Sequence, residues 1–225
     1  MASAQSRIEA MRFSALRAGG PLAEDMKPWV FGGGLRPTRY SLVADEGVVV
    51  LRAEAENSAS GIVREVRLDP RAFPVISWRW KVINVLERAD IRSRAGDDFA
   101  ARVYVTFELD PATLPAAERM KLGVARLRYG ESVPAAALCY VWDAKAPRDT
   151  LVPNAYTDRV RMIVAESGAA RAGKWVGVQR NIRDDYKRAF GSEPAGVTGV
   201  IVSTDTDNTG ESAVAFYGDI TFGPA

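Results

Sequence analysis

Arginine and tyrosine side chains give this chain its clearest capacity to bind a polar ligand. Arg102 and Tyr104 lie two positions apart in an alternating segment, so both project from one face of a strand. A planar guanidinium recognises carboxylates and vicinal hydroxyls through paired hydrogen bonds. We therefore predict a polar ligand-binding face that also carries Arg79, Lys81, Asp98 and Tyr217. The alternative is a solvated sheet face with surface ion pairs such as Arg102–Asp98.

A second cluster of oxygen-bearing side chains lies in the segment Ser203-Thr-Asp-Thr-Asp-Asn-Thr-Gly210. Asp205, Asp207 and Asn208 offer the hard oxygen ligands that Ca²⁺ prefers, so we predict a candidate calcium site there and no other cofactor. The segment departs from an EF-hand loop after its start, since Phe216 occupies the twelfth position. An Asx-rich turn that ends in glycine is equally consistent with these residues and is the alternative.

Composition excludes several kinds of enzyme. The 225 residues contain no histidine, which removes the usual general base, the usual activator of a serine nucleophile and the commonest metal ligand. The single cysteine, Cys139, forms no internal disulfide. The formal charge of +2 gives no reason to expect nucleic acid as a partner. A polysaccharide lyase or glycosidase that uses arginine, tyrosine and a carboxylate remains the catalytic alternative.

Alternation of apolar and polar residues predicts the elements that position these groups. Period-two segments separated by Gly, Pro, Asn and Asp indicate an all-β, antiparallel β-sandwich of about nine strands. The expected strands span 39–43, 48–55, 75–82, 99–107, 137–142, 159–165, 175–182, 197–204 and 213–222. One or two short helices are expected over 116–128 and 184–190. We predict a single domain over 12–225, preceded by a flexible or short N-terminal segment, 1–11.

The same alternation assigns side chains to faces of each strand. Trp78 and Trp80 fall on the apolar face of their strand, which favours core packing over a stacking platform for sugars. In the last strand Phe216 is expected to face the core and Tyr217 the polar side. Both faces around Tyr140 are apolar, so the period does not choose between them.

Several segments together resemble an uncharacterised bacterial family, domain of unknown function 3047. They include Pro74-Val-Ile-Ser-Trp-Arg-Trp-Lys81, Asp97-Asp-Phe-Ala-Ala-Arg-Val-Tyr-Val105 and Phe216-Tyr-Gly-Asp-Ile-Thr-Phe222. The resemblance runs from about residue 12 to the C-terminus. It implies a galactose-binding-type jelly roll, the architecture of many carbohydrate-binding modules. It also implies export to the periplasm or secretion, although no signal peptide is recognised in this chain.

These observations predict a non-catalytic domain that binds a polysaccharide or another glycan of the cell envelope. No segment approaches 18 consecutive apolar residues, so no membrane span is expected. A protein-interaction module that presents the loop 86–98 to an acidic partner is a further alternative.

Overall fold

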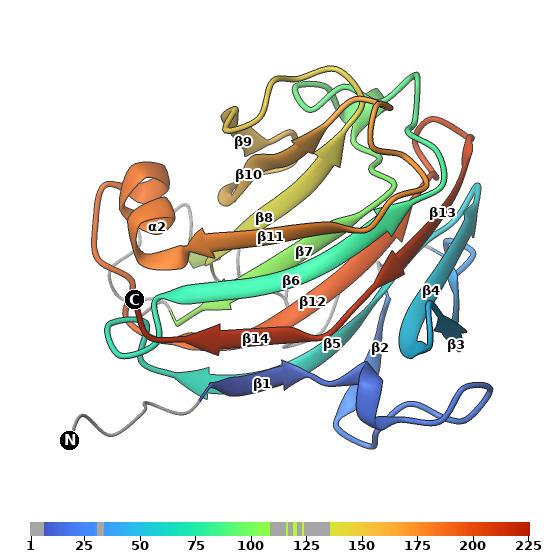
Figure 1. Cartoon of the computed structure of the whole chain (residues 1–225). Coiled ribbons are helices and arrows are strands. Elements are labelled where there is room, and N and C mark those ends of the chain that lie inside the picture. Colours follow the sequence, from blue (N-terminus) through green and yellow to red (C-terminus); the bar gives the residue numbers. More distant parts are fainter. Residues whose placement is uncertain (1–6, 31–33, 109–115, 117–118, 121–122, 124–135) are drawn as a thin grey trace.

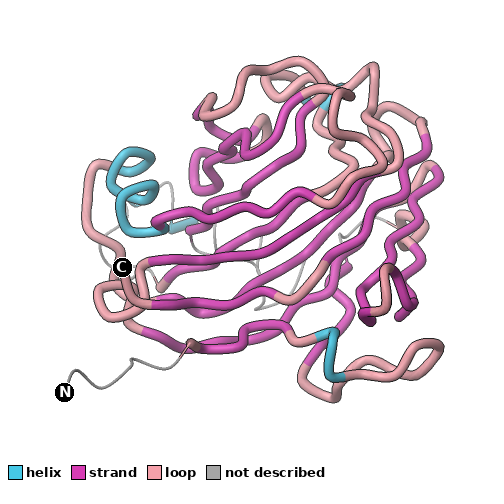
Figure 2. The backbone as a smooth tube through the Cα atoms, viewed as in Figure 1, coloured by secondary structure: helices cyan, strands magenta, loops and turns pink. Residues whose placement is uncertain are grey.

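The computed structural model contains two β-sheets stacked face to face, with strands dominating the chain (Figures 1 and 2). It describes residues 7–30, 34–108 and 136–225, together with 116, 119, 120 and 123. The expected helix over 116–128 therefore lies largely outside the described residues. Within the described residues no helix is long and apolar enough to cross a bilayer.

Each sheet has seven strands among the described residues. The first sheet, called sheet A, comprises in order β1 (Ile8–Met11), β14 (Ile220–Gly223), β6 (Val75–Val82), β13 (Ser212–Tyr217), β4 (Val48–Glu56) and β3 (Arg39–Asp45), with β11 (Val176–Asn181) on the other side of β6. The second, sheet B, comprises β2 (Met26–Val30), β5 (Ala59–Leu68), β12 (Val197–Asp205), β7 (Arg102–Phe107), β8 (Ala136–Asp143), β10 (Thr157–Ser167) and β9 (Leu151–Asn154).

The chain passes repeatedly from one sheet to the other. Successive strands β4, β5, β6 and β7 alternate between sheets A and B, and so do β11, β12 and β13. The predicted β-sandwich is therefore confirmed, with fourteen described strands instead of about nine. One pair departs from the antiparallel prediction: β10 runs parallel to β8, because the chain first forms β9 and then turns back.

Four of the additional strands were not predicted, and β5 shows why. Its first residues are small and polar, a composition typical of turns, yet they lie buried in the sheet between β2 and β12. Gly61 allows this close packing, because a Cβ there would lie 2.7 Å from the Val202 carbonyl oxygen and 3.2 Å from the Trp29 ring. The strand β1 lies within the segment predicted to precede the domain, and its Ala10 and Met11 are fully buried.

The core lies between the sheets and contains most of the tryptophan. Trp78 and Trp80 face it, as predicted, and are 4% and 0% exposed. Tyr140 and Trp142 reach it from sheet B, with ring centroids 5.3 Å from Trp78 and 5.9 Å from Trp80 respectively. Tyr140 and Trp142 therefore lie on the core-facing side of β8, which alternation alone did not identify.

The helix α2 (Ile182–Phe190) confirms the expected second helix and lies at one end of the sandwich (Figure 1). The Asn181 side chain caps its N-terminus by accepting hydrogen bonds from two backbone N–H groups, and Gly191 ends it with φ of 73°. Asp185 on this helix accepts hydrogen bonds from the Tyr140 hydroxyl and from Arg180. These contacts tie the helix to both sheets. Two short 3-10 helices, η1 (Phe13–Ala15) and η2 (Arg94–Gly96), also lie within the described residues.

The prediction for the last strand was wrong in its first half. Ala213, Ala215 and Tyr217 face the core, whereas Phe216 lies on the outer face of sheet A. The expected strand is interrupted: Tyr217 pairs with Trp80 and Thr221 with Ser77, so four steps on one chain match three on β6. This extra residue is a β-bulge at Gly218–Asp219, and it reverses which alternate side chains point inward.

Candidate functional site

The outer face of sheet A, away from the core, carries a cluster of cationic and aromatic side chains. Arg79 and Lys81 project there from β6, as alternation predicted. The Trp175 ring, from the residue before β11, lies 4.4 Å from the Arg79 guanidinium carbon and 5.1 Å from Lys81 Nζ. Phe216 contributes a second ring 4.6 Å from Lys81 Nζ. We call Arg79, Lys81, Trp175, Phe216 and Asp45 the sheet A cluster.

Asp45 at the end of β3 fixes the geometry of this cluster. It accepts hydrogen bonds from Lys81 Nζ at 2.7 and 2.6 Å and from the Trp175 indole N–H at 2.9 Å. The hydrogen bonds from Lys81, opposed by partial burial, lower the pKa of Asp45 below its usual value. Lys81 is consequently 9% exposed although it points outward. The cluster therefore holds the indole ring of Trp175 in one orientation.

The bulge at Gly218–Asp219 makes room for Arg79. A Cβ on Gly218 would lie 2.6 Å from Arg79 Cγ, so the arginine side chain crosses the bulge where no side chain stands. Among the described residues no acidic side chain forms an ion pair with Arg79. The Asp219 carboxylate is instead hydrogen-bonded by the backbone N–H and hydroxyl of Ser14, at 2.9 and 2.5 Å.

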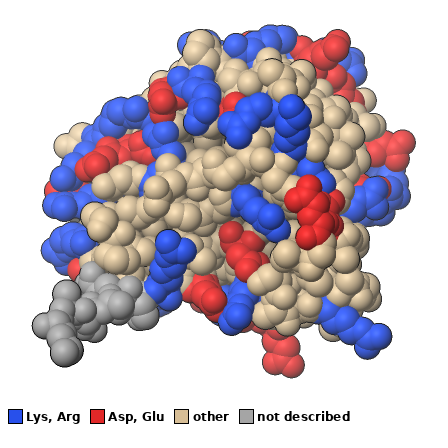
Figure 3. Space-filling model, in the orientation of Figure 1, with Lys and Arg blue, Asp and Glu red and all other residues tan. Residues whose placement is uncertain are grey.

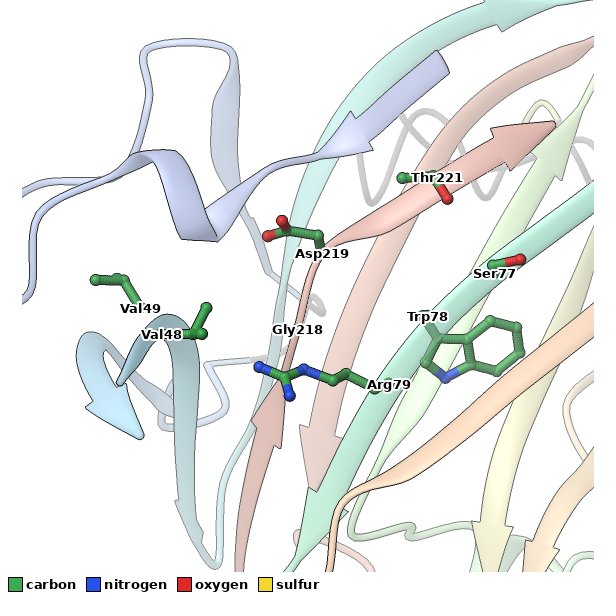
Figure 4. Close-up of a pocket in the computed structure, with 8 residues that line it drawn as sticks. All are labelled: Val48, Val49, Ser77, Trp78, Arg79, Gly218, Asp219 and Thr221. Carbon is green, nitrogen blue, oxygen red and sulfur yellow. The ribbon is translucent and has the colours of Figure 1, made fainter. Parts of the chain in front are cut away.

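A pocket of about 280 Å³ opens beside Arg79 on this face (Figure 4). Figure 4 shows the guanidinium pointing toward the β3–β4 hairpin, with Asp219 above it and the hydroxyls of Ser77 and Thr221 on neighbouring strands. In the space-filling view of this side, uncharged surface is bordered by both basic and acidic side chains (Figure 3). The pocket is lined by Val48, Val49, Ser77, Trp78, Arg79, Gly218, Asp219 and Thr221. It thus combines hydrogen-bonding groups with an apolar wall.

Arg102, predicted as a ligand-binding residue on an open face, is instead 2% exposed within sheet B. Its guanidinium donates to Asp205 at 2.8 Å and to Asp97 at 3.3 Å, and it packs over the Phe99 ring at 4.5 Å. The loop before β7 and the end of β12 fold over this side of the strand and supply these partners. Alternation therefore predicts correctly the side of β7 from which Arg102 projects, but it does not predict that this side is buried.

The six predicted ligand-binding residues do not share one face. Arg79 and Lys81 lie on the outer face of sheet A, and Arg102 and Tyr104 lie on the opposite outer side of the sandwich, under covering segments. Tyr217 is in the core, where its hydroxyl donates to the Ser203 carbonyl oxygen at 2.6 Å and accepts from the Arg102 backbone N–H. The prediction of a common polar face was therefore wrong, because the residues come from two different sheets.

The predicted calcium residues lie beside the buried ion pair. Ligand atoms of Asp98, Asp205 and Asp207 all lie within 4.8 Å of one another. Asp98, one of the predicted ligand-binding residues, is fully buried and accepts hydrogen bonds from the backbone N–H groups of Asn208 and Thr209. The Asn208 side chain donates to the Tyr156 hydroxyl. We call Asp98, Asp205 and Asp207 the carboxylate cluster.

Crowded carboxylates affect the titration of Asp205. Burial, with the nearby charges of Asp98 and Asp97 and against the opposing effect of Arg102, raises its pKa to about 7. Burial and Asp98 also raise the pKa of Asp207. A cation bound between these oxygens would favour their ionised forms.

The raised pKa of Asp205 predicts a pH dependence of stability. Because the folded state binds the proton more tightly than the unfolded chain, this contribution is present below about pH 4 and is lost as pH rises toward 7. We expect the free energy of unfolding to fall by up to about 1.4 kcal/mol per pH unit across that window. Urea titrations of the wild type and Asp205→Asn from pH 4.5 to 8 test this. Equal slopes for the two proteins would contradict it.

Sequence reasoning missed Asp45, Trp175 and Phe216 as members of one site. Trp175 begins one expected strand and Asp45 follows another, and neither position indicates a shared site. The only local signal was the pair Gly218–Asp219, which interrupts the alternation between two apolar runs and marks a bulge.

Taken together, the molecule is a β-sandwich that carries, on one outer face, a pocket with polar and aliphatic lining beside the aromatic rings of the sheet A cluster. The chain belongs to the family described as protein of unknown function (DUF3047), whose model matches residues 24–221. This confirms the family resemblance inferred from the sequence. No match was found among curated proteins.

Two solved structures of similar extent are both from Clostridium thermocellum. One is the family 11 carbohydrate-binding module of the cellulosomal cellulase Lic26A-Cel5E, with a TM-score of 0.46 and 9% identity over 99% of this chain and 97% of that one. The other is the family 30 carbohydrate-binding module of a second cellulosomal cellulase, with a TM-score of 0.43 and 13% identity over 97% of this chain and 98% of that one.

Proposed function

We propose that this protein is a non-catalytic glycan-binding domain and that the pocket beside Arg79 is its binding site. The observation that carries the proposal is the composition of that pocket on the outer face of sheet A. A guanidinium, two hydroxyls and an aliphatic wall line one small volume, and the fixed indole ring of Trp175 packs against that guanidinium. Sugar rings present hydroxyls at their edges and C–H groups on their faces, so both kinds of surface find complementary groups here.

The geometry favours binding over turnover. A glycosidase needs two carboxyl groups that flank the scissile bond, and among the described residues Asp219 is the one acidic residue that lines the pocket. A lyase would need an accessible tyrosine base, but Tyr104 and Tyr217 are buried, and burial raises the pKa of each. These features support a binding domain as the better of the two functions.

Binding to a panel of soluble polysaccharides, measured by calorimetry and affinity electrophoresis, tests the proposal. We expect at least one polymer to bind, and Trp175→Ala to weaken that binding by about tenfold or more. Tyr156→Ala is the matched control, because Tyr156 is an aromatic residue 53% exposed on the β9–β10 turn beside Asn208. Loss of binding in Tyr156→Ala with retention in Trp175→Ala would overturn the assignment, and so would absence of all binding.

We also propose, from the donor set of the carboxylate cluster, that Ca²⁺ stabilises the domain as a structural ion. Three carboxylates in close proximity, two of them buried, supply hard oxygen ligands, and in the part of the chain that the structure describes the one ion pair to them is that of Arg102 with Asp205. The export implied by the family resemblance stays a prediction, and a calcium-containing compartment would be consistent with it.

Thermal unfolding with and without millimolar CaCl₂ tests the calcium proposal. We expect Ca²⁺ to raise the Tm of the wild type, because an ion that binds the folded state alone stabilises it. Asp207→Asn should remove the increase, whereas Asp158→Asn, which changes an exposed carboxylate on β10, should retain it. An unchanged Tm in the wild type, or equal increases in all three proteins, would contradict the proposal.

A further inference from the structure

The Arg79 guanidinium is held in place before any ligand binds. It stacks against Trp175, 4.4 Å from the ring centroid, and Trp175 is itself fixed by its hydrogen bond to Asp45. On the other side its aliphatic stem crosses Gly218, where a Cβ would lie 2.6 Å away. A preorganised arginine loses less conformational entropy when it binds an anion than a freely rotating one does.

The charge of this guanidinium is not neutralised by a direct partner. The Asp45 carboxylate accepts hydrogen bonds from Lys81 and Trp175, and the Asp219 carboxylate accepts hydrogen bonds from Ser14. Among the residues that the structure describes, no acidic group forms an ion pair with Arg79, in contrast to Arg64, Arg102 and Arg180. The pocket therefore has at its edge a guanidinium that forms no ion pair among the described residues, while the Asp219 carboxylate in the same lining is oriented by Ser14.

The remaining groups of the pocket suit a sugar ring that carries a planar anion. Ser77 and Thr221 are paired across β6 and β14, so their hydroxyls lie side by side on the outer face. Val48, 38% exposed, lies across from them on the β3–β4 hairpin. A guanidinium binds a carboxylate through two parallel hydrogen bonds, whereas hydroxyls and aliphatic groups recognise the ring to which it is attached.

We propose that the ligand class is an acidic glycan whose uronate carboxylate is bound by Arg79, with the adjacent ring hydroxyls bound by Ser77 and Thr221. This inference rests on the proposed glycan-binding function and narrows it from glycans in general to those that contain uronic acid. Arg79 is the residue that distinguishes an acidic sugar from its neutral analogue.

The test compares each acidic polymer with its own carboxyl-reduced form. Oligogalacturonate and alginate oligosaccharides, and the reduced neutral counterpart of each, are titrated into the full chain by calorimetry. We expect the wild type to bind an acidic form at least tenfold more tightly than its neutral counterpart, and the preference to decline as salt rises. Arg79→Gln should abolish this preference. Gly218→Ala should reduce it while the guanidinium is still present, because the added methyl group displaces the arginine stem.

Arg67→Gln is the matched control, since Arg67 is an exposed arginine on sheet B that pairs weakly with Glu108 at 3.4 Å. It should bind as the wild type does. Equal binding of acidic and neutral forms, or binding of neutral polymers alone, would overturn this inference and leave the proposed function intact. An acid preference retained in a folded Arg79→Gln protein would overturn the role of Arg79. Absence of binding to any polymer, acidic or neutral, would overturn both proposals.

Discussion

Replacing Arg102 with methionine is expected to lower the free energy of unfolding by about 3–5 kcal/mol. The substitution leaves the buried carboxyl groups of Asp205 and Asp97 without their cationic partner and without its hydrogen-bond donors, and breaking a buried ion pair by removing one partner is strongly destabilising. Urea denaturation at pH 7 measures the effect. The loss arises from one buried site, so glycan binding by the folded fraction should be unchanged.

The control for this experiment is Arg67→Met. The Arg67 side chain is 74% exposed, and its removal should change stability by no more than about 0.5 kcal/mol. A loss below about 1 kcal/mol in Arg102→Met would show that the cluster does not need its cation. Unchanged stability combined with lost binding would return Arg102 to the role in ligand recognition that alternation first suggested.

Replacing Trp80 with alanine should destabilise the protein by about 3–5 kcal/mol. Trp80 is fully buried, and its ring lies 5.4 Å from that of Trp78 and 5.9 Å from that of Trp142. The cavity left between the sheets cannot be refilled without moving these large rings. Chemical denaturation of the variant provides the measurement.

Trp80→Phe separates packing from hydrogen bonding in this experiment. The Trp80 indole N–H is buried with no hydrogen-bond partner among the described residues, so phenylalanine removes an unsatisfied polar group while keeping an aromatic ring. We expect a smaller loss than for alanine. Trp175→Ala should cost less stability than Trp80→Ala, because the Trp175 ring is partly exposed on the outer face. A larger loss of stability in Trp175→Ala than in Trp80→Ala would contradict the assignment of Trp80 to the core and Trp175 to the outer face.

The strand faces could be predicted wherever a segment alternates without interruption. In β6, Trp78 and Trp80 face the core and Arg79 and Lys81 do not, as the sequence predicted. Across β13 and β14 the same reasoning failed at the bulge, because one extra residue changes the side on which every preceding side chain lies. A period-two pattern predicts which side chains face the core only where the strand pairs with its neighbour without a bulge.

Burial and long-range partners could not be predicted from local patterns. Asp45 lies 36 residues from Lys81 and 130 from Trp175 along the chain, yet it binds both side chains. Arg102 alternates correctly with apolar neighbours, but the covering loop makes its environment a buried ion pair instead of solvent. Each site is created by strands that meet only in the folded sandwich, so residue type identified candidates and tertiary structure decided their roles.

The indole N–H resonances of the five tryptophans offer the most direct test of the binding face. In a titration with uronate oligosaccharides, heteronuclear NMR should show the Trp175 signal moving with ligand concentration, since its indole N–H belongs to the cluster that holds Arg79. The signals of the core residues Trp80 and Trp142 should move much less. Saturable shifts that leave Trp175 unaffected and map to the Tyr156 turn or to sheet B would contradict the account.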